Sequence, residues 1–437
     1  MASPAMDVES SEFATEPVPD DRTVGWFRVA LVATMVAFSL PTFLTGLEIA
    51  VVSSPERTIN ILVAGAIILT IIGSMTAAIG ANTRLSSYML NRVAFGSRGA
   101  ALVNLAFALS LLGWFGVNID LFSGAVQRLA ADILGVTVPN WSIEVFAGLV
   151  MTITTVFGFR AINILSMILV PVLMAVTAQL ISGSLEVRSL AELMANNTAS
   201  EISFGDGVSA VVGAIIVGAV ILPDITRFIR HWRGAVYVVI IAYLVIELIV
   251  TGAGALAGAA LEDEDLLNIM LTLGIGWAAF AIVIFGSWVL NSLNLYSTML
   301  SVESTAQNLP NTLLIIVLGA LGTLAAFFNI LDYFLSFLFY LAIIFVPVSG
   351  VIVVDYLLLR RSAYHGEREQ LLEEVRPGAV ISWALGAAVA LTGSWGWISL
   401  SGIAAVDAML AAGISYYLLS RMGGQSKVPS SIKGDSV

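Results

Sequence analysis

Apolar residues along this chain gather in runs of about twenty, and short polar segments separate each run from the next. A helix of about 20 residues crosses the roughly 30 Å hydrocarbon core of a bilayer. The pattern therefore predicts an all-α polytopic membrane protein. About twelve transmembrane helices are expected, at residues 29–52, 58–80, 99–128, 143–159, 161–182, 207–229, 235–260, 266–300, 312–329, 332–359, 379–395 and 400–420.

Two of these spans contain residues that interrupt a helix. The first carries a Phe-Ser-Leu-Pro segment at 38–41, and the sixth carries Gly213, Gly218 and Pro223. Proline cannot donate a helical hydrogen bond, and it crowds the preceding turn. These residues either kink two continuous helices, since Gly and Pro are common in membranes, or make both helices discontinuous at matching places in two repeats. The second interpretation predicts a binding site near the membrane midplane, where helix ends offer backbone groups.

The third span combines an aromatic ring with polar groups at membrane depth. Trp114 and Asn118 are four residues apart and share one helix face, and Asp120 follows in the same run. A ring beside an amide that both donates and accepts hydrogen bonds suits a small, flat, polar ligand. An interfacial anchor is the alternative role for Trp114. A charge-capable side chain within an apolar run is by default a candidate for function.

The eighth span carries a polar stripe. Ser287, Asn291, Asn294 and Thr298 recur every three or four residues, so they lie on one face of the helix. The stripe either lines a cavity or joins helices by hydrogen bonds, which is a frequent use of Ser, Thr and Asn in membranes.

A short internal similarity favours two repeats. Residues 114–123 and 288–297 match without a gap at Trp, Leu and Ser, with Asp against Asn and Phe against Tyr. Spans three and eight are the counterparts that a five-plus-five repeat requires, although so short a match also arises by chance. The predicted organisation is a first repeat at 25–182, a second at 207–360, two further spans at 377–420, and tails at 1–24 and 421–437.

The composition agrees with this class and excludes others. Hydrophobic residues make up 58% of the 437 residues and charged residues 11%, too few to cover the surface of a soluble protein. Cysteine is absent, which excludes disulfides and thiolate metal sites. We find no Ser-His-Asp set, metal-ligand cluster, phosphate loop or basic patch, so we expect no enzyme, cofactor, metal site or nucleic-acid partner. The acidic tail 1–24 lacks the features of a signal peptide and is expected to be disordered.

Positively charged residues predict the orientation. If the spans alternate, most Arg and Lys residues fall on one side, and the acidic segment 262–265 falls on the other. Cytoplasmic loops carry the excess of Lys and Arg. Both termini are therefore predicted to be cytoplasmic, in a multi-pass protein of the cell membrane. The residues on the predicted cytoplasmic side are Arg84, Arg92, Arg98, Arg160, Arg227, Arg230, Arg233, Arg360, Arg361, Arg368, Arg376, Arg421, Lys427 and Lys433.

Four motifs carry a family resemblance. In chain order they are Arg92-x-x-Phe95-Gly96-x-x-Gly99, Gly113-Trp114-Phe115-Gly116, Asp224-x-x-Arg227-Phe228, and Pro347-x-x-Gly350 with Asp355-Tyr356. Through them, from about residue 25 to 420, the chain resembles the nucleobase–cation symporter family of cytosine, purine, uracil, allantoin and hydantoin permeases, and its cytosine permeases most.

The resemblance implies a LeuT-type fold, with ten helices as two inverted repeats of five and two helices added. It also implies alternating access around a site at the midplane. In similar proteins the Trp that matches Trp114 stacks on the substrate ring, and the residue that matches Asn118 is a hydrogen-bonding amide. The predicted substrate-binding residues are Trp114, Asn118, Asn291, Asn294, Ser287, Phe38 and Ile215.

Several positions depart from the family pattern. Ile215 stands where relatives carry a second aromatic residue, and Leu111 where cytosine permeases carry a glutamine, which argues against cytosine itself. Val289 and Leu290 replace two hydroxyl residues of sodium-coupled relatives. Sodium needs several oxygen ligands, whereas a proton needs only one buried carboxyl group.

We therefore predict coupling to H⁺ rather than Na⁺. The expected proton carrier is Asp120, with Glu48 second. A protonated Asp120 that only joins helices by a hydrogen bond is the alternative.

We predict a secondary active transporter that imports a nucleobase or related planar nitrogen heterocycle, such as cytosine, a purine, allantoin or hydantoin. Fold alone does not decide the substrate, so an amino-acid or amine carrier of the same fold is one alternative. The other, from a different class, is a membrane sensor that binds such a ligand without moving it. A sensor usually brings a soluble signalling domain, and no loop here is long enough to hold one.

The predicted orientation is testable with single cysteines, because the chain has none of its own. In intact cells an impermeant thiol reagent should label Glu264→Cys and should spare Arg368→Cys until the membrane is permeabilised. Labelling of Arg368→Cys from outside would reverse the orientation.

Overall fold

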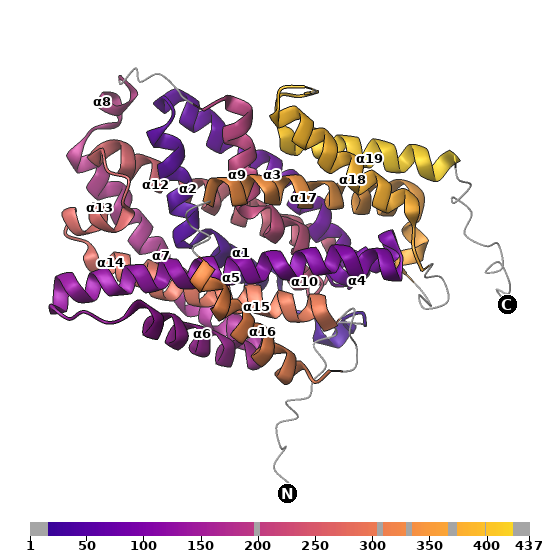
Figure 1. The fold of residues 1–437 in the computed structure, drawn as a ribbon, viewed down its shortest axis with the longest axis horizontal. Coiled ribbons are helices and arrows are strands. Elements are labelled where there is room, and N and C mark those ends of the chain that lie inside the picture. The colour runs from indigo at the N-terminus through magenta and orange to yellow at the C-terminus, as the bar shows by residue number, and fades with distance from the viewer. Residues whose placement is uncertain are drawn as a thin grey trace, which may run out of the picture.

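The computed structural model describes residues 16–195, 202–303, 309–328, 334–365, 374–397 and 399–422, and this part of the chain is almost entirely helical (Figure 1). The helices are α1 (Trp26–Ala37), α2 (Leu40–Val51), α3 (Pro55–Thr83), α4 (Ser87–Phe95), α5 (Ser97–Leu134), α6 (Asn140–Val156), α7 (Gly158–Val187), α8 (Leu190–Met194), α9 (Phe204–Ile221), α10 (Pro223–Thr226), α11 (Trp232–Val239), α12 (Glu247–Leu261), α13 (Leu266–Thr272), α14 (Gly276–Ala281), α15 (Ser287–Glu303), α16 (Asn311–Ala325), α17 (Phe334–Val354), α18 (Pro377–Ser394) and α19 (Ala404–Met422).

Short segments of other helix types continue or connect these helices. The π-helical segments η2 (Ile240–Ile246), η3 (Ile282–Gly286) and η6 (Asp355–Leu359) follow α11, α14 and α17 without interruption. The 3-10 segments are η1 (Asp20–Arg22), η4 (Ala326–Phe328) and η7 (Arg361–Tyr364). π-helical turns are rare and concentrate at functional sites.

The predicted spans all have helical counterparts. Nine helices of the described residues are long and apolar enough to cross a membrane, and the pair α1–α2, bent by 51°, is a tenth if counted as one span. The shorter apolar helix α6 and the C-terminal α19 correspond to the remaining two predictions. The helices are therefore consistent with twelve spans.

The start of the eighth span differs from the prediction. Residues 266–300 are not one helix, because α13 ends at Thr272 and a turn at Gly274 precedes α14. Gly274 has a φ of +71°, which residues with a side chain rarely adopt. The Asp265 side chain caps α13 by accepting from the backbone of Leu267. The apolar run thus contains a short separate helix before the span itself.

The sixth span also differs. α9 runs without a break through Gly213 and Gly218, and the helix is interrupted only at Leu222–Pro223. Gly213 instead allows close packing, since a Cβ atom there would overlap the carbonyl oxygen of Leu338 on α17. Of the three residues named for the sixth span, only Pro223 interrupts the helix, and Gly213 and Gly218 do not.

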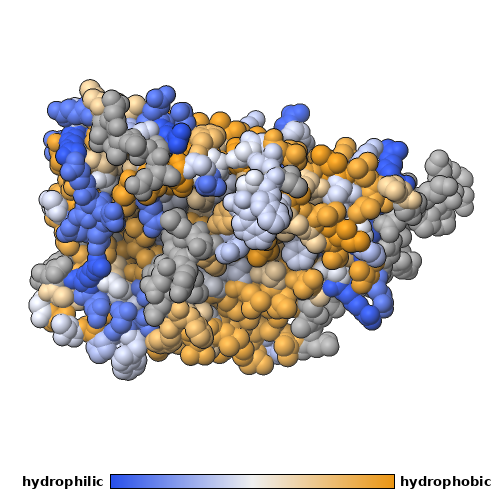
Figure 2. All heavy atoms as spheres, turned by 45° about the horizontal axis from the view of Figure 1, so that its top comes forward, coloured by the Kyte–Doolittle hydropathy of each residue, from blue (hydrophilic) through white to orange (hydrophobic). Residues whose placement is uncertain are grey.

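The long helices run side by side along one axis. In Figure 1 this axis is horizontal, with α4 at the right and α13 and α14 at the left; we call these the α4 end and the α13 end. Figure 2 shows hydrophobic residues over much of the middle of the visible face and hydrophilic residues concentrated at the α13 end. α9 is the most enclosed span, with 89% of its apolar core buried. A hydrophobic middle with hydrophilic residues concentrated at one end is the surface of a protein that lipid surrounds.

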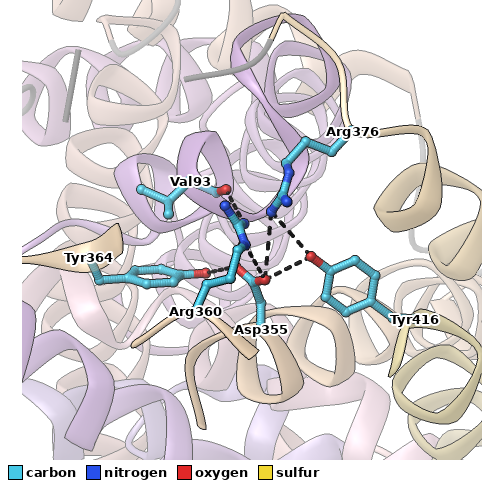
Figure 3. A network of polar contacts seen from close by, with 6 residues as sticks. All are labelled: Val93, Asp355, Arg360, Tyr364, Arg376 and Tyr416. Atoms are coloured by element: carbon cyan, nitrogen blue, oxygen red, sulfur yellow. Dashed lines mark hydrogen bonds and ion pairs between the residues drawn. The ribbon is translucent and has the colours of Figure 1, made fainter. Parts of the chain in front are cut away.

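A buried ion-pair network holds the last helices together at the α4 end (Figure 3). Asp355, fully buried in η6, accepts hydrogen bonds from Arg360, Tyr364 and Tyr416 at 2.6–2.9 Å. Arg376, just before α18, completes it at 3.6 Å from Asp355. Burial and the nearby Asp355 charge raise the pKa of the Tyr364 hydroxyl, so it remains a donor. One carboxylate thus joins α17, α18 and α19.

The network also reaches α4. Arg360 donates to the carbonyl oxygen of Val93 at 2.8 Å, and the backbone of Arg376 donates to that of Phe95 at 2.9 Å. The segment after the second span is therefore fastened to the C-terminal helices.

Replacing Asp355 tests this network. Asp355→Asn should lower the free energy of unfolding by about 3–5 kcal/mol, because Arg360 and Arg376 lose a buried counter-charge. Glu262→Gln breaks the exposed pair with Arg188 and should cost at most about 1 kcal/mol. Denaturant titration of both variants in detergent measures the difference. Equal losses would show that the buried network contributes no more than a surface pair.

Candidate functional site

A cavity lies beside the bend between α1 and α2, and we call it the bend cavity. The centre of a water-sized sphere can occupy about 60 Å³ within it, and the cavity is partly open to solvent. Its walls come from the bend at residues 36–42, from α5, α9, α10 and α15, and from η2. These helices belong to distant parts of the sequence, so the cavity is a product of the tertiary fold.

The bend follows from one proline. Pro41 sits in the first turn of α2, and Ser39 before it is extended, with φ −116° and ψ 152°. A proline cannot donate to the preceding turn, so α1 ends and α2 starts again in a new direction. The hydroxyl oxygens of Ser39 and Thr42 lie 3.0 Å apart, and both residues line the cavity. The bend thus places polar groups inside the bundle.

The carbonyl of Phe38 is packed against another span. A Cβ atom on Gly286, the last residue of η3, would overlap this oxygen. The Phe38 side chain is itself buried and is not part of the cavity wall.

Trp114 lines the bend cavity from α5. Its side chain is 7% exposed and meets Phe337 of α17 edge-on, with ring centroids 5.3 Å apart. Ile215, from the middle of α9, lines the same cavity. The structure therefore brings together the ring of Trp114 and the side chain of Ile215, which stands where relatives carry a second aromatic residue.

The predicted amides separate into two groups. Asn294 lines the cavity, whereas Asn118 and Asn291 are fully buried behind the wall. Asn291 donates to the carbonyl oxygen of Phe115 at 2.9 Å and accepts from Asn294 at 3.4 Å. Asn291 therefore connects α15 to α5 and orients the amide that lines the cavity.

Asn118 and Ser287 have unused hydrogen-bonding capacity. Asn118 donates to the carbonyl oxygen of Trp114 at 2.8 Å, one turn back on the same helix, and its own side-chain oxygen has no partner among the described residues. The hydroxyl of Ser287, also fully buried, has no partner there either.

The predicted coupling residues do not line the bend cavity. Asp120 is half-buried on α5, six residues beyond Trp114 towards the α13 end, and Glu48 is half-buried on α2. The carboxyl that does line the cavity is Asp224 of α10. It accepts from the backbone and hydroxyl of Ser87 at 2.9 and 2.6 Å, and from Ser297 at 3.1 Å.

Sequence reasoning missed several polar residues of the cavity wall. Ser39 and Thr42 stand beside the proline that breaks the first span, and Ser297 is one turn beyond Asn294. The polar stripe predicted on this helix does not coincide with the face that lines the cavity. That face carries Leu290, Asn294 and Ser297 on α15. A three-residue step from Asn294 would have found Ser297, but nothing in the sequence distinguished it from Thr298.

Comparisons with known proteins place this geometry in a family. A family model described as permease for cytosine/purines, uracil, thiamine and allantoin matches residues 17–419. The chain therefore belongs to this family of membrane permeases and is a transporter rather than an enzyme.

Two curated relatives are similar over most of the chain. A cytosine permease of Escherichia coli (strain K12) is 29% identical over 414 residues, which are 94% of this chain and 95% of the relative. A hydantoin permease of Microbacterium maritypicum is 23% identical over 370 residues, 78% of this chain and 74% of the relative.

Solved structures show the same fold. Mhp1, a nucleobase-cation-symport-1 family transporter, solved closed with bromovinylhydantoin bound, aligns with a TM-score of 0.80 at 20% identity, covering 94% of this chain and 95% of the other. An inward-facing structure of Mhp1 aligns at 0.77, with 18% identity over the same shares. The LeuT-type fold predicted from the sequence is confirmed.

Proposed function

We propose that this permease imports a nucleobase or a related small planar nitrogen heterocycle, such as cytosine, a purine, allantoin or hydantoin, by alternating access. The observation that carries the proposal is the bend cavity. The Trp114 ring, the Asn294 amide and the hydroxyls of Ser39 and Thr42 all line it. A flat ring surface suits a flat ligand, and amide and hydroxyl groups suit the alternating donors and acceptors of its edge.

The charge of the cavity favours a neutral or cationic ligand. Its described lining residues include one carboxyl, Asp224, and no Lys, Arg or His. A substrate that carries a carboxylate would find no counter-charge there, and burying an unpaired charge is costly. The cavity therefore supports a heterocycle over an amino acid. The names of the relatives, a cytosine permease and a hydantoin permease, agree with this substrate class.

Coupling to protons rather than sodium is also proposed. Val289 is fully buried, Leu290 lines the cavity, and the neighbouring Phe38 carbonyl is covered by Gly286. Val289 and Leu290 therefore supply no side-chain oxygen at the positions where sodium-coupled relatives carry two hydroxyl residues, although sodium needs several oxygen ligands. From the sequence alone, the expected proton carrier is Asp120, with Glu48 second.

We further propose that the protein lies in the cell membrane with the α4 end towards the cytoplasm. The arginines near this end among the described residues, including Arg84, Arg92 and Arg230, support this orientation through the excess of positive charge in cytoplasmic loops.

Substitution of Trp114 tests the binding site. Ligands that bind the folded protein raise its melting temperature, so a thermal-shift screen with cytosine, uracil, allantoin, hydantoin and amino acids identifies the substrate class. Trp114→Ala should then weaken binding at least tenfold, about 1.4 kcal/mol, whereas Trp114→Phe keeps most of it because a stacking face remains. Leu109→Ala, an exposed residue of the same helix, is the control. Normal binding by Trp114→Ala would place the site elsewhere.

Reconstitution tests the coupling ion. In proteoliposomes, an inward proton gradient should drive accumulation of the identified substrate, and a sodium gradient alone should not. The reason is that the bend offers too few oxygen ligands for sodium. Accumulation under sodium alone, unaffected by a proton gradient, would contradict proton coupling.

A further inference from the structure

A second buried carboxyl lies close to the bend cavity. Glu247, the first residue of α12, is 2% exposed, and its Oε2 atom has no hydrogen-bond partner among the described residues. A carboxyl group within a membrane span is costly, and such groups usually have a function. Asp224 and Asp355, the other deeply buried carboxyls discussed above, both accept several hydrogen bonds.

A tyrosine connects Glu247 to the cavity. Tyr243 lies one turn earlier, in the π-helical segment η2, and lines the bend cavity. Its hydroxyl is buried and without a hydrogen-bond partner in the described structure, and it lies beside Gly218 of the cavity wall. Tyr243 and Glu247 are four residues apart where η2 continues directly into α12, so their side chains lie on the same side of this helix. A phenol both donates and accepts a proton in hydrogen bonds, so it can bridge a carboxyl to a ligand or to water in the cavity.

Few charged groups surround Glu247. The elements packed on α12 are α1, α2, α3, α7, α13 and η2. Of these, α2 carries Glu48, which is half-buried in the last turn of the helix. The other charged residues stand in the first or last turns of their helices and are Arg28 of α1, Glu56 and Arg57 of α3, and Arg160 and Glu186 of α7.

We propose that Glu247, reached through the Tyr243 hydroxyl, carries the coupling proton of this transporter. The proposal rests on the transport function inferred above and assigns its proton site. It places the carrier on α12 rather than at Asp120 or Glu48.

Proton transfer to and from Glu247 has three steps. A proton from water in the outward-open cavity passes by way of Tyr243 to the Glu247 carboxylate and gives a neutral carboxylic acid. With substrate and proton both bound, the loaded bundle can change conformation without moving an uncompensated charge through its apolar interior. Once the cavity opens to the other side, substrate and proton leave, the proton by the same hydroxyl. The empty carrier returns with the carboxylate restored, so one proton is carried with each substrate. Substrate in the cavity contacts Tyr243, which links its binding to protonation.

Glu247→Gln tests the assignment because it keeps the shape and fixes the neutral state. Purified variants are reconstituted, and uptake of radiolabelled cytosine, uracil, allantoin and hydantoin is measured under an inward proton gradient and as exchange without a gradient. Glu247→Gln should keep exchange and binding, lose accumulation above the outside concentration, and lose substrate-dependent proton entry. Tyr243→Phe, which removes only the hydroxyl, should slow proton-driven uptake roughly fivefold, as for one lost hydrogen bond.

Glu144→Gln is the matched control. Glu144 on α6 is 4% exposed, and its Oε2 atom, like that of Glu247, has no hydrogen-bond partner among the described residues. Its Oε1 atom accepts from Ser123 and Asn140, and Glu144 does not line the bend cavity, so accumulation should persist. Should Glu247→Gln fail to fold, the Tyr243→Phe result decides, and unchanged coupled uptake there would overturn the proposal.

Two further outcomes separate this inference from the transport function. Full accumulation by Glu247→Gln, with loss in Asp120→Asn or Glu48→Gln, would overturn the Glu247 assignment and leave the transporter proposal intact. No uptake or exchange of any of the four compounds by the unmodified protein would instead overturn the proposed substrate class.

Discussion

The structure depends on one missing hydrogen-bond donor, the backbone nitrogen of Pro41. Inside a bilayer every backbone polar group must find a partner within the protein, so an interrupted helix is tolerated only where other helices enclose it. Here the enclosure is unusually close. A Cβ atom at Gly46 would overlap the carbonyl of Thr251, and one at Gly254 would overlap the carbonyl of Phe43. Glycines on both helices therefore let α2 and α12 touch along their backbones, which encloses the helix that follows the bend.

The same constraint explains how the cavity acquires its polar groups. At the bend, Ser39 and Thr42 hydrogen-bond to each other at 3.0 Å, which leaves both hydroxyls at the wall. On α15 the carboxamide of Asn291 joins two helices, and only then does Asn294 have a defined orientation. The amide of Asn294 thus depends on a buried residue behind the cavity wall. Precise recognition of a ligand requires this kind of support.

The sequence predicted the class, the spans and the first break because these follow from local features: run length and one proline. The predictions from sequence were wrong where contacts between distant helices determine the local structure. Gly213 and Gly218 serve helix packing and the cavity wall rather than a break, and the turn at Gly274 was hidden inside a continuous apolar run. The amides were found by type, but which of Asn118, Asn291 and Asn294 faces the cavity depends on the rotation of each helix. No π-helical turn is visible in a hydrophobicity pattern, and η2 is what carries Tyr243 to the cavity.

The buried carboxyls differ in what surrounds them, and this difference separates structural from functional roles. Asp224 accepts three hydrogen bonds from Ser87 and Ser297, and Asp355 is held by arginines and tyrosines from three helices. Removing or adding a proton at either group would disturb many partners at once. Glu247 instead has a buried oxygen with no hydrogen-bond partner among the described residues. Hydrogen bonds and ion pairs stabilise the charged form of a buried carboxyl, and an unpaired buried charge is costly. Glu247 is therefore better suited to bind and release a proton than Asp224 or Asp355.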